Sequence, residues 1–244
     1  MLLENKLMGK KYTHLFFDLD NTLWDFKTNS KYAMRATFTA LSLGEYKIDF
    51  DRFFQIYSLH NANLWIAYRK RQVSKKDLIR QRFQLTFEAC GIKDTDPLMA
   101  NELYLQEMPR QSHLVEGAKE VLNQLRTKGY KLYIITNGFK EVQHAKLLKA
   151  GLDGYFEKLF ISEEVKVPKP GWEIFEYAIK SSNAKKKSSL MIGDDWDVDI
   201  CGALNFGIDA VYLAKDGSSS KMDLSAEKSD VRTIQHLNQL MDFL

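Results

Sequence analysis

The stretch His14-Leu-Phe-Phe-Asp18-Leu-Asp20-Asn-Thr22-Leu-Trp24 guides the interpretation of this chain of 244 residues. A short apolar run ends here in two carboxylates one residue apart, followed by a turn-forming Asn and a Thr. Such runs are typical of buried strands in parallel sheets, whose carboxyl ends bind ligands in open α/β folds. Two close carboxylates repel each other, which favours a cation between them or a raised pKa on one. The alternative is that Asp18 and Asp20 only cap a turn or the next helix.

The composition excludes several classes of protein. Hydrophobic residues make up 45% and charged residues 27%, as in ordinary globular proteins of one large or two modest domains. A net charge of +3, mixed along the chain, argues against a nucleic acid polymer as partner. No run approaches the ~18 apolar residues of a membrane span, so we expect no membrane partner. Cys90 and Cys201 lie far apart and no signal peptide is recognisable, which favours a cytoplasmic location.

The pattern of apolar residues divides the chain into two regions. Residues 28–108 show helical periodicity without a second strand-like run, and one helix there is expected at 75–89 after the N-cap Ser74. From Val115 onward, short apolar runs alternate with helical segments, which predicts a parallel sheet with right-handed crossovers. The expected strands are 131–135, 159–161, 189–192 and 210–213, and the expected helices are 117–128, 140–149, 172–181 and 197–205.

These two patterns predict a split α/β core with an inserted helical domain. The core comprises residues 1–24 and 109–244, and the helical domain comprises residues 25–108. Residues 214–230, rich in Ser, Lys and Asp, are expected to form a loop, and residues 231–244 a short closing helix.

Polar residues follow four of the expected strands. They are Asp18 and Asp20, then Thr136 and Asn137, then Lys169, and finally Asp194, Asp195, Asp197 and Asp199. Because parallel strands share one orientation, these residues are expected to converge on one crevice. Carboxylate oxygens suit Mg²⁺, and a lysine acts as a point charge toward phosphate oxygens. The set therefore favours phosphoryl transfer, in which catalysis is mostly positioning and charge neutralisation.

These residues resemble the four motifs of the haloacid dehalogenase (HAD) superfamily. The resemblance rests on Asp18-x-Asp20-x-Thr22, Thr136, Lys169 and Gly193-Asp194 with Asp199, which occur in the family's order and span nearly the whole chain. It implies a Rossmann-like α/β core. It also implies that the helical insert is a C1-type cap, a lid that excludes water and shapes specificity.

The resemblance also implies a role for each residue. Asp18 is expected to be the nucleophile that forms an aspartyl-phosphate, and Asp20 the general acid and later the base. Asp18, the backbone carbonyl of Asp20 and Asp194 are expected to bind Mg²⁺. Thr136 and Lys169 are expected to hold the phosphoryl oxygens, with a further polar contact from Asn137. Asp199 is expected to bond a metal-bound water or to orient Lys169, and Asp195 to lie beside the metal ligands. For Asp197 a charge at a helix start is expected.

Asp20 favours a phosphatase over a dehalogenase, because haloacid dehalogenases proper lack the second Asp; a phosphomutase would share these residues. Three segments resemble the bacterial pyrimidine 5′-nucleotidase branch: 63–68, 134–139, and 161–165 with Lys169-Pro170. That resemblance implies UMP, dUMP or dTMP as substrate. Trp65 and Tyr68 either stack on a base or, as we favour, pack inside the cap. A phosphatase for a small sugar phosphate or phosphoglycolate is the alternative enzyme, and a non-catalytic metabolite-binding protein is the alternative of another class.

Overall fold

The computed structural model describes residues 11–214 and 231–244. Contacts within the chain divide it into two units, residues 1–26 with 113–244 and residues 27–112. Among the residues that the structure describes, no helix has both the length and the apolar character needed to cross a membrane.

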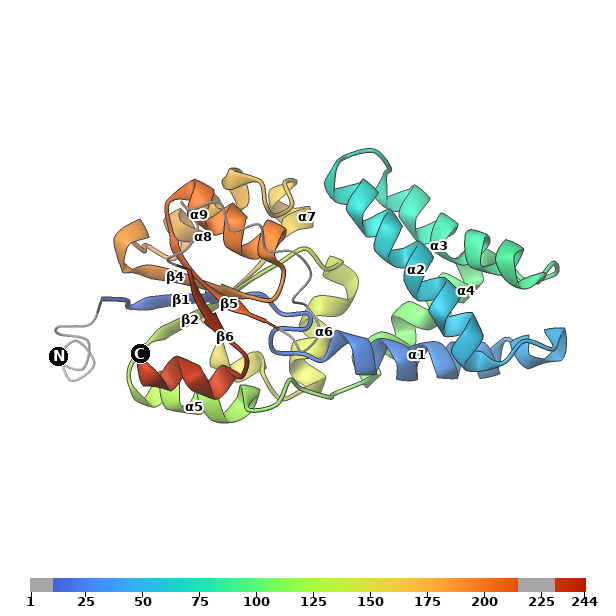
Figure 1. The fold of residues 1–244 in the computed structure, drawn as a ribbon, viewed down its shortest axis with the longest axis horizontal. Helices are drawn as coiled ribbons and strands as arrows, with labels where there is room; N and C mark the ends of the chain where they lie inside the picture. Colours follow the sequence, from blue (N-terminus) through green and yellow to red (C-terminus); the bar gives the residue numbers. More distant parts are fainter. Residues whose placement is uncertain (1–10, 215–230) are drawn as a thin grey trace. The chain divides into compact units, whose positions relative to one another are not determined.

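The first unit is built on a parallel sheet, as the alternating pattern predicted, and the sheet has six strands where five were expected. The strands are β1 (His14–Phe17), β2 (Lys131–Thr136), β3 (Lys158–Ile161), β4 (Ser189–Gly193), β5 (Asp209–Leu213) and β6 (Arg232–Ile234). Their order is β3-β2-β1-β4-β5-β6, and every neighbouring pair is parallel. β1 lies in the middle of the sheet, between β2 and β4 (Figure 1). The direction of winding reverses at β1, and open α/β sheets bind ligands at such a point, beyond the carboxyl ends of the strands.

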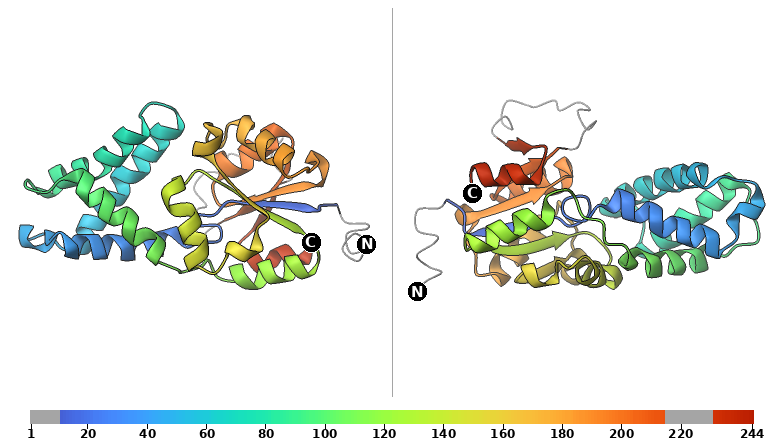
Figure 2. Two further views of the ribbon diagram at one scale, coloured as in Figure 1. Left: turned by 180° about the vertical axis from the view of Figure 1, so that it is seen from behind. Right: turned by 90° about the horizontal axis from the view of Figure 1, so that it is seen from below.

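Helices cover both faces of this sheet. They are α5 (Ala118–Thr127), α6 (Lys140–Lys149), α7 (Ser162–Val165), α8 (Trp172–Ser181) and α9 (Cys201–Phe206), with 3₁₀ turns at η4 (Asp153–Tyr155), η5 (Lys186–Ser188) and η8 (Leu237–Asp242). Figures 1 and 2 show α5 and η8 on one face and α8 and α9 on the other. α8 buries Ile174, Phe175 and Ala178, spaced as one side of a helix requires, against a core that includes Phe16 and Tyr133 of the sheet.

Two predicted elements of this unit were wrong in detail. Residues 231–244 do not form one closing helix, because Arg232–Ile234 adds β6 at the edge of the sheet and only η8 is helical. A strand of three residues is too short to show a period, and its pairing with β5 decides its structure. Instead of a single helix over 197–205, a π-helical turn η6 (Trp196–Ile200) precedes α9. The loop expected at 214–230 falls, from residue 215 on, outside the described residues.

The second unit is helical, with α1 (Phe26–Ala40), α2 (Phe50–Arg69), α3 (Lys75–Cys90) and α4 (Pro97–Glu107), and with 3₁₀ turns η2 (Leu43–Tyr46) and η3 (Met108–Arg110). Ser74 begins α3 in a capping box with Asp77, which satisfies backbone N–H groups of the first turn. Tyr57 of α2, Phe83 of α3 and Tyr104 of α4 are buried with ring centroids 5.1–6.1 Å apart. Aromatic packing therefore joins these three helices.

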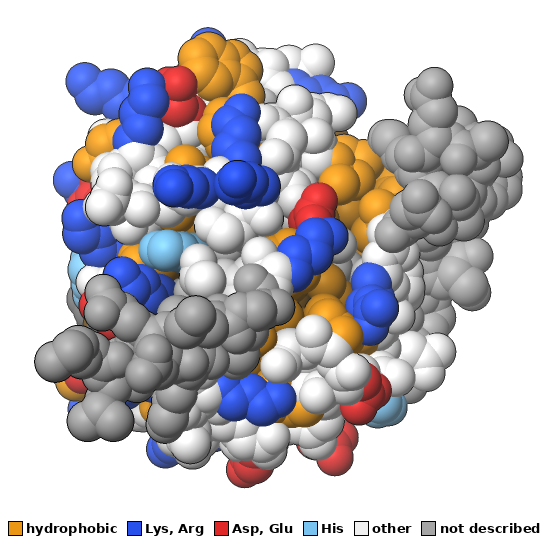
Figure 3. Space-filling view, turned by 90° about the vertical axis from the view of Figure 1, so that its left-hand side faces the viewer, with side chains coloured by type: hydrophobic (Ala, Val, Ile, Leu, Met, Phe, Trp, Pro, Cys, Tyr) orange, Lys and Arg blue, Asp and Glu red, His pale blue; other side chains and the backbone are white. Residues whose placement is uncertain are grey.

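On the face drawn in Figure 3, Lys and Arg side chains lie in small groups among apolar, acidic and uncharged ones. A nucleic acid polymer calls for a basic stripe or patch, and the absence of such a partner stays a prediction from the net charge of +3.

Candidate active site

The site begins where β1 ends. The backbone N–H of Asp18 donates to the carbonyl of Ile192 in β4 at 2.9 Å, so Asp18 is the last residue held by the sheet. Directly after it, the Leu19 carbonyl accepts three backbone N–H groups of a tight turn. That turn requires a left-handed residue, and Asn21 provides it with φ 66°, a conformation that Asn tolerates. The turn therefore carries Asp20 just beyond the sheet edge.

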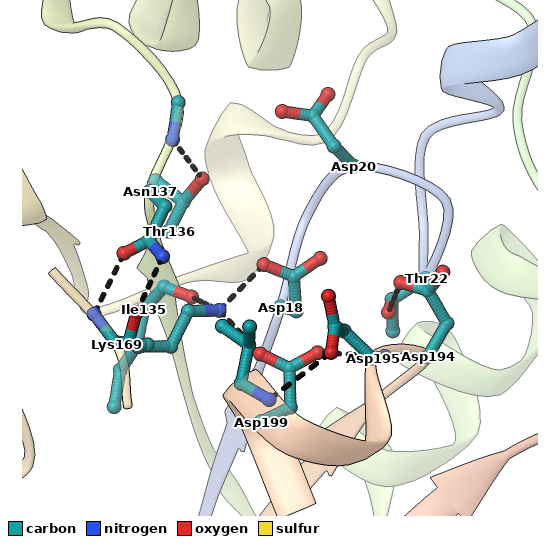
Figure 4. A network of polar contacts seen from close by, with 12 residues as sticks. Asp18, Asp20, Thr22, Ile135, Thr136, Asn137, Lys169, Asp194, Asp195 and Asp199 are labelled. Carbon is teal, nitrogen blue, oxygen red and sulfur yellow. Dashed lines mark hydrogen bonds and ion pairs between the residues drawn. The ribbon is translucent and has the colours of Figure 1, made fainter. Parts of the chain in front are cut away.

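Lys169 is a buried cation at the centre of the site. Its ammonium donates to Asp18 Oδ1, Asp199 Oδ1 and the Ile135 carbonyl, each at 2.7 Å (Figure 4). Three donors thus meet three acceptors, which is the full capacity of an ammonium. Asp199 thus contacts Lys169, and both roles predicted for Asp199, orienting Lys169 and bonding a metal-bound water, stay predictions. The contact of Lys169 with phosphoryl oxygens stays a prediction.

Burial controls the titration of this group. Burial raises the pKa of Asp18 to about 7, and Lys169 opposes that rise. Burial also raises the pKa of Asp199, again against Lys169. Burial alone would lower the pKa of Lys169, but Asp18 and Asp199 raise it above its ordinary value. The lysine therefore stays charged, and the two carboxylates share one ammonium.

The turn after β4 positions Asp199 and Asp195. Asp199 Oδ2 accepts from the Asp195 N–H at 3.1 Å, and a Cβ at Gly193 would lie 2.3 Å from that same oxygen. Residue 193 therefore has to be glycine for Asp199 to approach the strand end. The Asp195 carboxylate accepts from Val198 N–H at 3.0 Å and so caps η6, whereas Asp197 is exposed in its first turn. Both lie at the helix start, where carboxylates are favourable.

Asp18, Asp194 and Asp199 form a cluster that suits a divalent cation. One oxygen from each lies within 4.8 Å of the others, and Thr22 Oγ1 donates to Asp194 Oδ1 at 3.1 Å. Three carboxylates and the one ammonium of Lys169 leave two negative charges, which one divalent ion would balance. Oxygen donors are the ligands that Mg²⁺ prefers. Both oxygens of Asp199 accept protein donors, Oδ1 from Lys169 and Oδ2 from the Asp195 N–H, whereas Lys169 meets Asp18 through Oδ1. Asp18 and Asp194 are therefore the better placed metal ligands.

Thr136 and Asn137 follow β2 at the same edge. Thr136 Oγ1 accepts from Gly138 N–H at 3.0 Å and from Gln143 Nε2 at 2.8 Å. Asn137 exchanges two hydrogen bonds with the backbone of Lys169, at 2.8 and 2.9 Å. The amide of Asn137 thus ties the loop after β3 to the end of β2, a role that the sequence did not indicate.

Asp20 lies apart from the carboxylate cluster. In Figure 4 its carboxylate is directed away from Asp18 and Lys169. It accepts instead from Lys146 Nζ at 2.8 Å and Gln143 Nε2 at 3.2 Å, both on α6. Sequence reasoning missed Gln143 and Lys146, because polar residues three apart on a helix are most often its solvent face.

Comparison with known proteins agrees with this geometry. A family described as haloacid dehalogenase-like hydrolase matches residues 12–207. Pyrimidine 5′-nucleotidase YjjG of Escherichia coli is 34% identical over 207 residues, which are 83% of this chain and 86% of that protein. Pyrimidine 5′-nucleotidase PynA of Streptococcus pneumoniae is 32% identical over 202 residues, which are 82% of this chain and 83% of that protein.

Other similar proteins carry different names. Glyceraldehyde 3-phosphate phosphatase of Pyrococcus furiosus is 30% identical over 234 residues, 94% of this chain and 92% of that protein. A crystal structure of the HAD-hydrolase YfnB of Bacillus subtilis bound to magnesium is 25% identical and superposes with a TM-score of 0.82, covering 96% of this chain and 98% of that one. The predicted α/β architecture with its Rossmann-like core is thereby confirmed.

Proposed function

The chain belongs to the haloacid dehalogenase-like hydrolases, and from that premise we propose that it is a Mg²⁺-dependent 5′-nucleotidase acting on pyrimidine nucleoside monophosphates. The coarser statement, a phosphoric monoester hydrolase, follows from the family and its phosphatase relatives. The observation that carries the proposal is the buried group of Asp18, Lys169 and Asp199, with Asp20 two residues beyond the nucleophile.

Asp18 and Asp20 divide the chemistry between them. The Asp18 carboxylate attacks phosphorus, an aspartyl-phosphate forms, and the ester oxygen leaves with a proton from Asp20. Water then attacks the aspartyl-phosphate, Asp20 takes up its proton, and inorganic phosphate leaves as Asp18 is regenerated. The ion pair with Lys169 at 2.7 Å fixes the direction of the Asp18 carboxylate. Its fixed position lowers the entropic cost of attack.

Thr136 supplies a donor to the phosphoryl group. Its hydroxyl oxygen already accepts from Gly138 and Gln143, so its own proton is directed to another acceptor. We assign that acceptor to a phosphoryl oxygen. Lys169 is the neighbouring positive charge, and Asn137 holds the backbone of Lys169 in register.

The metal site is assigned to Asp18, Asp194 and the backbone carbonyl of Asp20, with Asp199 and Asp195 beside it. The support is the oxygen donor set and its two uncompensated negative charges. Bound there, Mg²⁺ supplies charge neutralisation for the phosphoryl oxygens.

The relatives support the substrate class. Two of them are named pyrimidine 5′-nucleotidases, which favours UMP, dUMP or dTMP. The second candidate is a small sugar phosphate, favoured by the relative that is named glyceraldehyde 3-phosphate phosphatase. We assign the helical unit, residues 27–112, as the C1-type cap that selects between them. Cys90 and Cys201 both lie in the described part of the chain and form no disulfide, which is compatible with the cytoplasmic location we propose.

The test is phosphate release, with Mg²⁺ and with EDTA, across nucleoside monophosphates, sugar phosphates and phosphoglycolate. We expect Mg²⁺-dependent release that is fastest with UMP, dUMP or dTMP. Release led by sugar phosphates would keep the chemistry and discard the nucleotidase assignment. No release from any ester would overturn the phosphatase and favour a protein that binds a metabolite without turnover.

A further inference from the structure

We propose that Lys146 and Gln143 of α6 are positioning residues for Asp20, holding its carboxylate in place for both proton transfers. The inference rests on the proposed phosphatase mechanism, in which Asp20 serves first as acid and then as base. Neither residue belongs to the motifs from which the site was predicted.

Lys146 is built into the site rather than into the surface. Its side chain is 3% exposed, and its ammonium lies 2.8 Å from Asp20 Oδ1. The same ammonium lies 4.4 Å from the centroid of the Trp24 ring and 5.7 Å from that of Phe26. Both rings belong to the segment that follows Asp20, and a cation over an aromatic face is attracted to it. Lys146 therefore joins α6 to the turn that carries Asp20.

Gln143 connects Asp20 to the phosphoryl-binding side of the site. It is fully buried, and its Nε2 donates both to Asp20 Oδ2 at 3.2 Å and to Thr136 Oγ1 at 2.8 Å. A Cβ at Gly138 would lie 2.2 Å from the same nitrogen, so glycine at 138 makes this position possible. One amide thus sets the separation between the acid and the hydroxyl that we assign to the phosphoryl group.

Together the two residues occupy both oxygens of the Asp20 carboxylate. Gln143 and Lys146 lie three positions apart on α6 and so present their side chains on the same side of the helix. With one oxygen on each, rotation of the carboxylate is restrained. A group that must give and then accept a proton at the same place gains from such restraint, because misplacement by about 1 Å can cost about 10²-fold in rate.

The leaving group provides the test. An alkyl phosphate such as UMP needs an acid at its leaving oxygen, whereas p-nitrophenyl phosphate leaves as a weakly basic phenolate. We expect Lys146→Met to slow single-turnover release of uridine from UMP by about 10²-fold, the scale of general acid catalysis. Release of p-nitrophenolate in the first turnover should change by less than about threefold in the same variant.

Three further variants decide between positioning and mere structure. Lys146→Arg keeps the cation and should recover most of the rate with UMP. Asp20→Asn with Lys146→Met should be no slower than Asp20→Asn alone, since a residue that acts through Asp20 has nothing left to position. Lys149→Met is the matched control, because Lys149 is an exposed lysine on the same helix. If Lys146→Met does not fold, Gln143→Met should show the same dependence on the leaving group.

The outcomes separate this inference from the proposed function. Equal slowing of both esters by Lys146→Met, or a loss that adds to that of Asp20→Asn, would overturn the positioning role. Full activity of Lys146→Met with UMP would overturn it as well. A wild-type protein that releases neither leaving group would refute the phosphatase itself, and with it the role of Lys146.

Discussion

Buried cations have different partners in the two units of this chain: carboxylates in the α/β unit and neutral amides in the helical unit. In the α/β unit, Lys169 and Lys146 each lie within 2.8 Å of aspartate carboxylates. In the helical unit, Arg82 is just as buried at 3% exposed, but it donates to the side-chain amide oxygens of Asn101 and Asn61. The α/β unit thus brings together ionised side chains that can take part in a reaction. The helical unit satisfies the N–H donors of Arg82 with uncharged amide oxygens.

This difference separates a reactive centre from a structural one. Arg82 lies on α3, Asn61 on α2 and Asn101 on α4, so the hydrogen bonds join three helices of one bundle. The amide partners are neutral, so no carboxylate among them balances the charge of Arg82. Their hydrogen bonds offset part of the free-energy cost of burying that charge. In the α/β unit the excess is negative, and it lies where three strand ends meet. Substitutions at the charged site of the α/β unit should therefore lower activity, whereas substitution of Arg82 should lower the free energy of unfolding.

The largest effect is expected from Asp18→Asn. The substitution removes the nucleophile, so turnover should fall by at least about three orders of magnitude in steady-state phosphate release. The fold should persist, because the amide keeps the shape of the side chain and relieves a buried charge. Circular dichroism and the melting temperature serve as controls, and activity that persists in a folded variant would refute Asp18 as nucleophile.

Asp20→Asn should have the next largest effect. Loss of the acid and base should lower kcat with UMP by about 10²–10³-fold. Mg²⁺ affinity, measured by calorimetry, should change little, because the backbone carbonyl of Asp20 is the ligand we assign. Abolished Mg²⁺ binding would show that the division of roles between Asp18 and Asp20 is wrong.

Arg82→Met tests the structural centre. It leaves the amide oxygens of Asn61 and Asn101 without their buried donor, which should lower the free energy of unfolding by about 1–3 kcal/mol. Urea denaturation measures that change. Single-turnover rates with p-nitrophenyl phosphate should stay near wild type, and a selective loss of that chemistry would break the distinction between the units.

The same distinction explains how much the sequence could predict. Asp18, Thr136, Lys169 and Asp194 were identified because each follows an apolar strand, and parallel strands bring their ends together. Lys146 and Gln143 carry no such signal, since a helix surface is normally polar. Helices in residues 28–108 were expected from their period, but Arg82 meets its amide partners only through the packing of α2, α3 and α4. The edge strand β6 was missed for the same reason, because its pairing is not local.

Metal binding should depend on pH in a defined direction. Burial raises the pKa of Asp18 to about 7, above its ordinary value in an unfolded chain. The metal-free folded state therefore binds the extra proton, and this group's contribution to stability falls as pH rises from about 4 to about 7. Mg²⁺ needs the carboxylate, so it competes with that proton.

The rise in melting temperature caused by Mg²⁺ should thus be larger at about pH 8 than at about pH 5.5. Each tenfold change in affinity is worth about 1.4 kcal/mol at saturating Mg²⁺, which corresponds to roughly 3–6 °C for a protein of this size. Asp18→Asn is the control, because it removes the competing proton and should flatten the dependence. A larger rise at the lower pH would contradict the assignment of Asp18 as a ligand.

The smallest and most selective effect is expected at Trp65. Its ring meets that of Tyr68 edge-on at 5.7 Å, and both side chains are half-buried in the helical unit. If this pair only packs within the cap, as the sequence favours, Trp65→Leu should alter KM for UMP and for glycerol phosphate to the same small extent. If it stacks on the base, KM for UMP alone should rise, by a factor corresponding to about 1–3 kcal/mol. Comparing the two substrates in one variant separates these readings, because a general loosening of the cap cannot distinguish a base from a glycerol.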